Sequence, residues 1–329
     1  MFDKQRLSKK YNKTKDKHGK CFAFVYMIFF VVRNCINNLL LKLYKQGRHN
    51  DHIKKILFIE PLKQGYGDIF FQTSLFDSLH KSGYEVNVLI KKDHDQILLN
   101  NPNVTKLYFW SIDDISKIIS SKFLIVSLGR STLRETFLFL CSFWSDKIFL
   151  DRDTKKWSNI FLENPNTLAW VIITEYYLKI KLETPLPQIY FSEEEKATVT
   201  SNRSQHKVGV VYGVMDNRKK SSEIERIIEL LPGSKDIILF GKGKQSYSGK
   251  RKVNKLVNKL SYRQTLVELS TCETLIGTEG SLTQISASLI PNTLVIDNGG
   301  KFRENAHPNL LSGVCVYKEK EVDNLLNDI

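Results

Sequence analysis

The stretch KILFIEPLKQGYGDIFFQTSLFDSL, residues 55–79, contains three patterns in succession. It opens with an apolar run, Ile56–Ile59, of the length and composition of a buried strand. A turn-rich segment with two glycines follows, and apolar residues at every fourth position from Phe71 to Leu79 then predict one buried face of a helix. Strand, loop and helix in this order form the first unit of an open α/β sheet. Such sheets bind ligands at the carboxyl ends of their strands.

One carboxylate, Asp68, lies where this loop becomes the helix. Asp is common at helix starts, where its side chain accepts backbone N–H bonds from the first turn. A carboxylate at the carboxyl edge of a sheet can also act as a general base. The residue pattern by itself leaves both roles open.

Strand and helix patterns alternate along the rest of the chain, in two series separated by a polar segment. Apolar runs of strand length occur in the first series at residues 84–90, 104–110, 123–128 and 147–150, and in the second at 208–212, 236–240, 274–277 and 293–297. Helical patterns lie between them, at 95–100, 112–121, 133–143, 167–181, 222–231, 247–256, 266–270 and 282–289. This alternation predicts two parallel sheets covered by helices.

The fold class predicted from these patterns is α/β, with two Rossmann-like domains facing each other across a cleft. We expect an N-terminal domain at residues 53–184, a linker at 185–207 and a C-terminal domain at 208–329. Residues 1–52 form a separate basic and apolar arm.

The arm carries most of the positive charge of the chain. Residues 1–55 have a net charge of +11, out of +14 for all 329 residues. The body is therefore nearly neutral, which argues against a nucleic-acid-binding protein with a basic face on a folded domain. The apolar run at residues 22–32 has eleven residues, too few for a membrane-spanning helix, which needs about 20.

The arm favours an interfacial helix whose residues 1–50 meet an anionic membrane surface. The alternative is a helix packed on the domain with a solvated basic tail. The five cysteines are scattered without CxxC spacing, and the seven histidines form no HxH or HExxH pair. We therefore expect no disulfide framework, no metal site and a reducing compartment.

The segment LIGTEGSLTQISASLI, residues 275–290, repeats the order of strand, small-residue turn and helix. Thr278, Gly280 and Ser281 place backbone N–H groups at a helix start, which favours an anion such as a phosphate. Glu279 beside this turn could hold the hydroxyls of a ribose or another sugar, as acidic residues do in dinucleotide sites. Simple capping of the helix by Ser281 or Thr278 is the alternative.

Several segments, in a fixed order and spacing, together resemble one protein family. In the first half they are KILFIEPLKQGYGDIFFQTSLFDSLHKSGYEVNVLI, NNPNVTKLYF and FLIVSLGRSTLRETFLFLCSFWSDKIFLDRD. In the second half they are VGVVYGVMDNRKKS, DIILFGKGK, KLSYRQTLVELSTCETLIGTEGSLTQISASL and NTLVID. The series resembles the heptosyltransferases, glycosyltransferase family 9, over residues 53–318. These enzymes transfer a heptose from ADP-heptose to the inner core of lipopolysaccharide.

The resemblance implies a GT-B type fold and an inverting glycosyltransferase. Its donor is a nucleotide-sugar, with ADP-heptose as the first guess, and its acceptor is a lipid-linked glycan such as a lipopolysaccharide or lipooligosaccharide core. Asp68 matches the carboxylate that the family uses to deprotonate the acceptor hydroxyl. The implied location is the cytoplasm, peripheral on the cytoplasmic face of the inner membrane, with no nucleic-acid partner. A non-catalytic member of the fold, binding a glycan or partner at the membrane, is the alternative.

The resemblance also places donor-binding residues in the second half. Lys219 or Lys220 matches a lysine that contacts the donor diphosphate, where a cation neutralises charge on the leaving group. The other positions that match are Tyr212 and Gly213 near the phosphates, Leu260 against the nucleobase, and Glu279, Gly280 and Ser281 in the anion-binding turn. Leu260 has core packing as an equally good interpretation.

Two positions depart from the family pattern. Glu279 replaces an aspartate, and Gln284 stands where the family has a histidine, so it cannot carry that positive charge. These departures leave the donor sugar open. The DxD triplet Asp151–Asp153 is the pattern with which other glycosyltransferases hold a metal, but it lies far in sequence from the donor half. We therefore predict no cofactor and no required metal.

Overall fold

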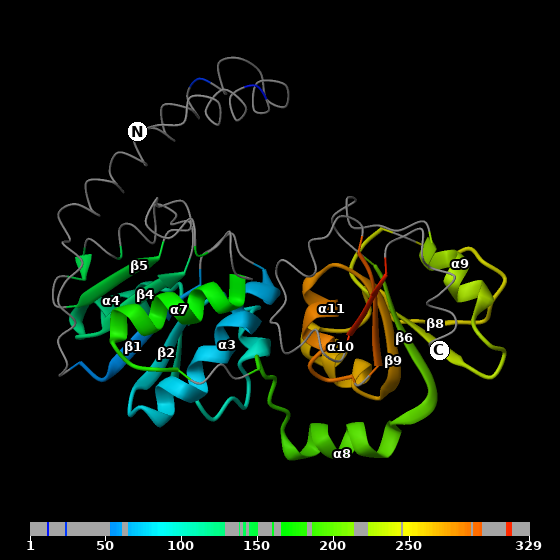
Figure 1. The fold of residues 1–329 in the computed structure, drawn as a ribbon, viewed down its shortest axis with the longest axis horizontal. Coiled ribbons are helices and arrows are strands. Elements are labelled where there is room, and N and C mark those ends of the chain that lie inside the picture. Colours follow the sequence, from blue (N-terminus) through cyan, green and yellow to red (C-terminus); the bar gives the residue numbers. More distant parts are fainter. Residues whose placement is uncertain are drawn as a thin grey trace.

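The computed structural model of the chain describes residues 12, 24, 53–60, 65–128, 138, 141–142, 145–150, 160, 166–182, 186–213, 223–244, 246–290, 292–297 and 314–317. Figure 1 shows these residues as two α/β lobes side by side. The predicted arm, residues 1–52, lies outside the described residues except for Asn12 and Phe24. Among the described residues, no helix combines the length and apolar character needed to cross a membrane.

The first domain is built on a five-stranded parallel sheet with the strand order β3-β2-β1-β4-β5. Its strands are β1 (Lys55–Ile59), β2 (Glu85–Ile90), β3 (Lys106–Phe109), β4 (Leu124–Leu128) and β5 (Asp146–Leu150). Its helices are α3 (Tyr66–Lys81), the short 3-10 helix η1 (Asp95–Ile97), α4 (Ile112–Ser120) and α7 (Asn166–Leu178). The strand and helix at residues 55–79 thus form as their pattern predicts.

The second domain has a six-stranded sheet, also parallel, in the order β11-β10-β9-β6-β7-β8. Its strands are β6 (Ser204–Gly213), β7 (Asp236–Gly241), β8 (Asn254–Lys255), β9 (Cys272–Thr278), β10 (Asn292–Ile296) and β11 (Val314–Tyr317). Its helices are α9 (Glu223–Leu230), α10 (Tyr262–Leu269) and α11 (Ser281–Ser286). The α/β fold with two Rossmann-like domains is confirmed.

Three local predictions differ from the structure. The predicted linker contains a helix, α8 (Glu193–Asn202), which lies below the second lobe in Figure 1. Ser192 starts this helix with a capping box to Glu195, a signal present in the sequence. The helix predicted at residues 247–256 does not form, because the segment bends at Gly249 and continues into β8. Helix α10 begins at Tyr262 instead of Leu266, after a capping box of Ser261 and Gln264.

The apolar core is continuous from one domain to the other. Helix α4 covers one face of the first sheet, and α9 covers the outer face of the second. The two faces that remain, covered by α3 and by α10 and α11, share a single cluster that includes Phe70, Leu75, Leu266 and Ile285. The two domains are therefore packed together through apolar side chains.

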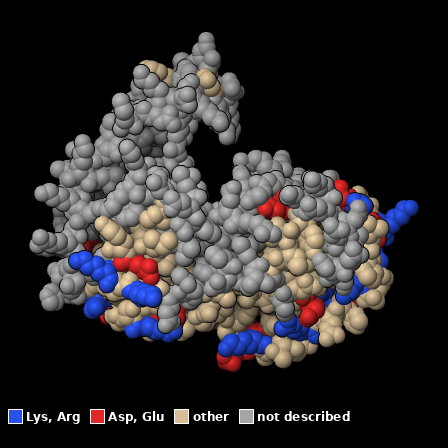
Figure 2. All heavy atoms as spheres, viewed as in Figure 1, with Lys and Arg blue, Asp and Glu red and all other residues tan. Residues whose placement is uncertain are grey.

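The strand orders define where each domain is expected to bind a ligand. In each sheet the chain leaves the first strand on one side and returns on the other, so the switch points lie between β1 and β4 and between β6 and β9. Open α/β sheets bind ligands in the crevice at such a point, beyond the carboxyl ends of the strands. Figure 2 shows basic and acidic side chains interspersed over both lobes in that view, as expected for a nearly neutral body.

Candidate active site

The loop after β1 brings Asp68 to the start of α3, beside the first switch point. Gly65 is the N-cap of this helix, and Asp68 lies three residues into it. The Gly65 N–H donates to Asp68 Oδ2 at 2.9 Å, and the Asp68 N–H donates to the Gly65 carbonyl at 3.1 Å. Asp68 is exposed. The carboxylate therefore stabilises the helix start and still reaches solvent, so capping does not preclude a second role.

The turn after β9 brings Glu279, Gly280 and Ser281 to the start of α11, beside the second switch point. Gly280 is the N-cap of this helix, and no side chain caps it. Gln284 is only 5% exposed, and its N–H donates to the Gly280 carbonyl at 2.9 Å. The Gln284 side chain is therefore buried where α11 packs against α3.

The two helix starts touch each other. A Cβ atom placed on Gly67 of α3 would lie 3.1 Å from Gln284 Oε1 and 3.2 Å from Ser281 Cβ. Glycine allows this close approach without displacing either neighbour, since α3 and α11 pack directly against each other. The structure thus brings together, from opposite domains, the stretch with the predicted base and the stretch with the predicted anion-binding turn.

Among the other predicted donor residues, Tyr212 and Gly213 lie at the end of β6, and Leu260 lies between β8 and α10. The Tyr212 hydroxyl donates to Glu225 of α9, behind the second sheet, and burial together with that carboxylate raises the pKa of Tyr212. A Cβ on Gly213 would approach Val257 Cγ1 at 2.8 Å, so this glycine also permits a tight packing contact. Leu260 packs against the core cluster. The predicted Lys219 and Lys220 and the triplet Asp151–Asp153 lie outside the described residues.

A buried acid, which the sequence analysis did not identify, lies at the carboxyl end of β1. Glu60 has no exposed surface. It accepts hydrogen bonds from the Lys91 N–H at 2.8 Å and from His94 Nδ1, and Lys91 Nζ lies 3.4 Å from Glu60 Oε1. This network ties the segment after β2 to the end of β1. The sequence signal that could have identified Glu60 is a charged residue directly after an apolar strand.

Two tyrosines join the domains next to this network. The ring of Tyr66 in α3 stacks on that of Tyr262 in α10, with centroids 3.7 Å apart and planes inclined by 4°. Tyr66 also contacts the His94 ring, and its hydroxyl donates to the Asp93 carbonyl at 3.1 Å. Burial raises the pKa of Tyr262 further above physiological pH, at which a tyrosine with its ordinary pKa is already neutral. The stack therefore contributes packing and not charge.

A buried arginine connects the second domain with α8 and with the first domain. Arg263 of α10 is 7% exposed and donates to both carboxylate oxygens of Glu195, at 2.7 and 2.5 Å. It also donates to the Tyr190 carbonyl at 2.6 Å, and its N–H donates to Gln96 Oε1 of the first domain at 2.9 Å. The Arg263 guanidinium holds the pKa of Glu195 below its ordinary value.

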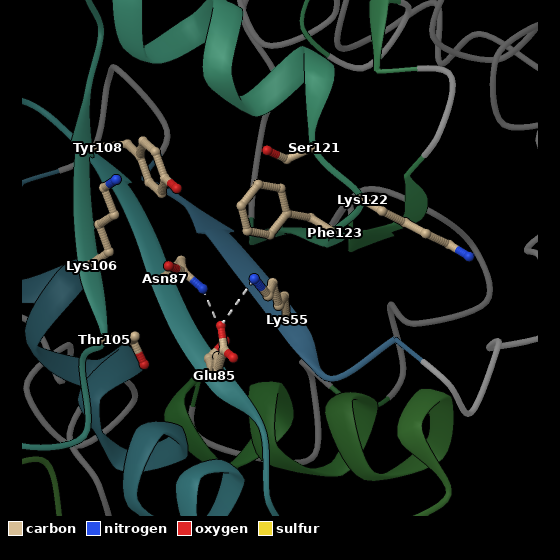
Figure 3. A pocket seen from close by; sticks show the side chains of 9 residues that line it. All are labelled: Lys55, Glu85, Asn87, Thr105, Lys106, Tyr108, Ser121, Lys122 and Phe123. Carbon is tan, nitrogen blue, oxygen red and sulfur yellow. Dashed lines mark hydrogen bonds and ion pairs between the residues drawn. The ribbon is translucent and has the colours of Figure 1, made fainter.

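A pocket of about 480 Å³ lies at the opposite, amino edge of the first sheet (Figure 3). Lys55, Lys106 and Lys122 line it with Glu85, above a floor of aromatic rings. Lys55 is paired with Glu85 at 3.6 Å, and Lys106 Nζ lies 4.9 Å from the centre of the Tyr108 ring. Because ligands of open α/β sheets bind at the carboxyl edge, this pocket is not the candidate active site.

No set of three or more His, Cys, Asp or Glu side chains is arranged to hold a metal ion within the described part of the chain. The described site is therefore made of carboxylates, small residues and backbone groups at two facing sheet edges. Such groups can accept a proton, hold hydroxyls and bind phosphate oxygens.

No protein-family model matches the chain, and no curated protein matches it by sequence. Solved structures do match it. The glycosyl transferase family 9 structure from Veillonella parvula is 14% identical, covers 84% of this chain and 92% of its own, and has a TM-score of 0.62. The E. coli ADP-heptose lipopolysaccharide heptosyltransferase II is 14% identical, covers 83% and 97%, and has a TM-score of 0.63.

The E. coli heptosyltransferase WaaC, solved with ADP, is 11% identical, covers 83% of this chain and 99% of its own, and has a TM-score of 0.60. At these identities the likeness establishes the fold. The resemblance to glycosyltransferase family 9 seen in the sequence is thus confirmed for the architecture, over nearly the full length of the similar structures.

Proposed function

We propose that the protein is an inverting glycosyltransferase that moves a sugar from a nucleoside-diphosphate-sugar to a lipid-linked, cell-surface glycan. The observation that carries the proposal is the contact between the starts of α3 and α11 at Gly67, Ser281 and Gln284. It sets a solvent-exposed carboxylate, Asp68, close to the turn that follows β9. The two helix starts follow β1 and β9, each of which borders a switch point of its sheet.

In the proposed reaction Asp68 accepts the proton of the acceptor hydroxyl. The acceptor oxygen forms a bond to the anomeric carbon of the donor sugar while the bond from that carbon to the diphosphate oxygen breaks. The nucleoside diphosphate leaves with the bonding electron pair. Cations and backbone N–H groups offset the charge of the leaving group. We assign this role to Lys219 or Lys220 and to the turn of Glu279, Gly280 and Ser281.

Heptose and a lipopolysaccharide or lipooligosaccharide core are the first donor sugar and acceptor to test. The fold is shared with heptosyltransferases, one of which was solved with ADP. No metal is required in this mechanism, because the leaving group is neutralised by protein groups. We further propose that residues 1–50 adsorb to the cytoplasmic face of the inner membrane, where positively charged segments meet anionic lipid.

The test is sugar transfer by the full chain from nucleotide-sugars to truncated lipopolysaccharide, with Asp68→Asn beside wild type. The amide oxygen of Asn can still accept the Gly65 N–H, so the fold should be retained. Loss of a general base should lower the rate by about 10²–10⁴-fold. Asp77→Asn, the same substitution later in α3, serves as the control. Full activity of Asp68→Asn would refute the assigned base, and no transfer by wild type would favour a non-catalytic binding protein.

A further inference from the structure

A second acid, Asp297, lies at the carboxyl edge of the second sheet. Asp297 follows β10 directly, and its residue surface is 8% exposed. Its N–H donates to the Tyr317 carbonyl at 2.8 Å. Its side-chain Oδ1, however, is buried without a hydrogen-bond partner among the described residues. Burying an acid without a donor for its oxygen is unfavourable.

The strand register places Asp297 beside Glu279. Ile296 of β10 is opposite Thr278 of β9, and the next residue of each strand is an acid. Neighbouring strands lie about 4.8 Å apart, so the two acids are adjacent at this edge.

The face of the sheet on which Asp297 lies follows from its neighbours. Val295 is opposite Gly277, and a Cβ on Gly277 would lie 2.6 Å from Thr283 Oγ1 of α11. Side chains two residues apart share a face of a strand, so Asp297 lies on the face covered by α11. This is the face that packs towards the first domain. Asp297 is thus on the same side as the proposed donor site.

We infer that Asp297 acts with Glu279 as a specificity-determining pair that accepts hydrogen bonds from two vicinal hydroxyls of the donor. The inference rests on the proposed function and names the ligand group of the same site. Adjacent carboxylates have only acceptor oxygens, and a vicinal diol supplies two O–H donors. Acidic residues hold ribose hydroxyls in this way in dinucleotide-binding sheets.

Two parts of a nucleotide-sugar carry vicinal hydroxyls, the ribose and the transferred sugar. The experiment compares wild type, Asp297→Asn and Asp236→Asn for binding of ADP, UDP, ADP-heptose and UDP-glucose by calorimetry, and for thermal unfolding without ligand. Asp236 begins β7 at the opposite edge of the same sheet and is exposed, so its variant is the matched control. The unfolding measurement separates a ligand-binding acid from a structural one.

We expect Asp297→Asn to unfold at the same temperature as wild type or higher, because an unsatisfied buried acid is removed. It should lose about tenfold or more in affinity, since hydrogen bonds to charged groups are strong. A loss confined to the nucleotide-sugars assigns the diol to the transferred sugar, and an equal loss for ADP or UDP assigns it to the ribose.

The inference is overturned by unchanged affinity for every ligand that wild type binds, or by a lower unfolding temperature of the unliganded variant. If wild type itself binds none of the four nucleotides at concentrations that saturate comparable enzymes, the proposed function fails and the inference fails with it. The two failures are therefore distinguishable by the wild-type titration.

Discussion

Two of the contacts between the domains differ in their chemistry. At the first, Arg263 is buried and donates hydrogen bonds to Glu195 in α8, to Tyr190 and to Gln96 of the first domain. At the second, the starts of α3 and α11 approach so closely that a Cβ on Gly67 would lie 3.1 Å from Gln284 Oε1 and 3.2 Å from Ser281 Cβ. The first contact is directional and polar, and the second depends on the small size of the groups that meet.

The difference suggests two separate roles. The Arg263 contact holds the domains together, and the Gly67 contact positions the groups that we propose to react. The Arg263 contact lies beside η1 and α8, near the segment that connects the domains. The Gly67 contact lies beside Asp68 and the turn of Glu279, where we propose that chemistry occurs. Substitutions at the first contact should therefore affect stability most, whereas substitutions at the second should affect binding and activity more than stability.

Arg263→Ala should have the largest effect on stability. It leaves the Glu195 carboxylate without its guanidinium, and it removes the guanidinium donors to the backbone carbonyls of Tyr190 and Gln96. The backbone N–H that donates to Gln96 Oε1 is retained. Breaking a largely buried pair costs about 3–5 kcal/mol, and Glu195 keeps 24% of its side chain exposed, so we expect about 2–3 kcal/mol. Unfolding in urea measures this loss in the free energy of unfolding.

The matched control is Lys196→Ala, which removes an exposed pair with Glu193 and should change the free energy of unfolding by less than about 0.5 kcal/mol. A change of that small size for Arg263→Ala would contradict the assigned role of the arginine.

Gly67→Ser should have the next largest effect, because the added Cβ meets Ser281 and Gln284. Overpacking costs about 1–3 kcal/mol, and the helix starts must separate. We expect weaker nucleotide binding in calorimetry together with a lower unfolding temperature. Gly65→Ser is the matched control, since a Cβ there meets nothing within 4 Å and Ser is favoured at an N-cap. Equal effects of the two substitutions would show that close approach is not what Gly67 provides.

The stack of Tyr66 on Tyr262 should couple the domains by a smaller amount. Aromatic pairs contribute about 0.5–1.5 kcal/mol beyond the area they bury. A double-mutant cycle with Tyr66→Leu and Tyr262→Leu, followed by urea unfolding, should give a coupling energy in that range. The pair Tyr108 and Phe123, edge-on at 6.1 Å within the first domain, provides the comparison. A coupling energy of zero would show that the stack does not help to hold the domains together.

The smallest expected effect is a pH dependence of the Arg263 contact. Because Arg263 holds the pKa of Glu195 below the ordinary value of 4.5, the ionised carboxylate favours the folded state. This contribution is complete above the ordinary pKa and is lost as the pH falls through the folded pKa. The difference in unfolding free energy between wild type and Arg263→Ala should therefore be smaller at about pH 3 than at pH 7. A constant difference would contradict the ionic part of the contact.

Much of the fold could be predicted because apolar periodicity records which faces are buried. The strand at Ile56–Ile59 and the helix after it are fully explained in this way, as are most later strands. Helix α8 and the start of α10 were missed because capping boxes, and not apolar faces, begin them. The helix predicted at 247–256 was wrong because Gly249 and the basic residues after it form bends instead.

The candidate site was predictable in part. The Asp68 and Glu279 stretches were each identified as candidate site segments, and the contact of Gly67 with Ser281 joins them. Glu60 and Asp297 were not found, because a single acid after a strand has no periodic signal. Their roles depend on partners from distant segments, such as His94, or on the lack of a partner among the described residues.

The most direct test of the account is binding of nucleotides to the full chain, measured by thermal unfolding with ADP, UDP, GDP and CMP. The account predicts that one nucleotide stabilises wild type, by about 2.7 kcal/mol at 100 times its dissociation constant. The stabilisation should be lost in Glu279→Ala and retained in Glu273→Ala, an acid near the start of the same strand. No stabilisation of wild type by any nucleotide would contradict the proposed donor site and with it the transferase function.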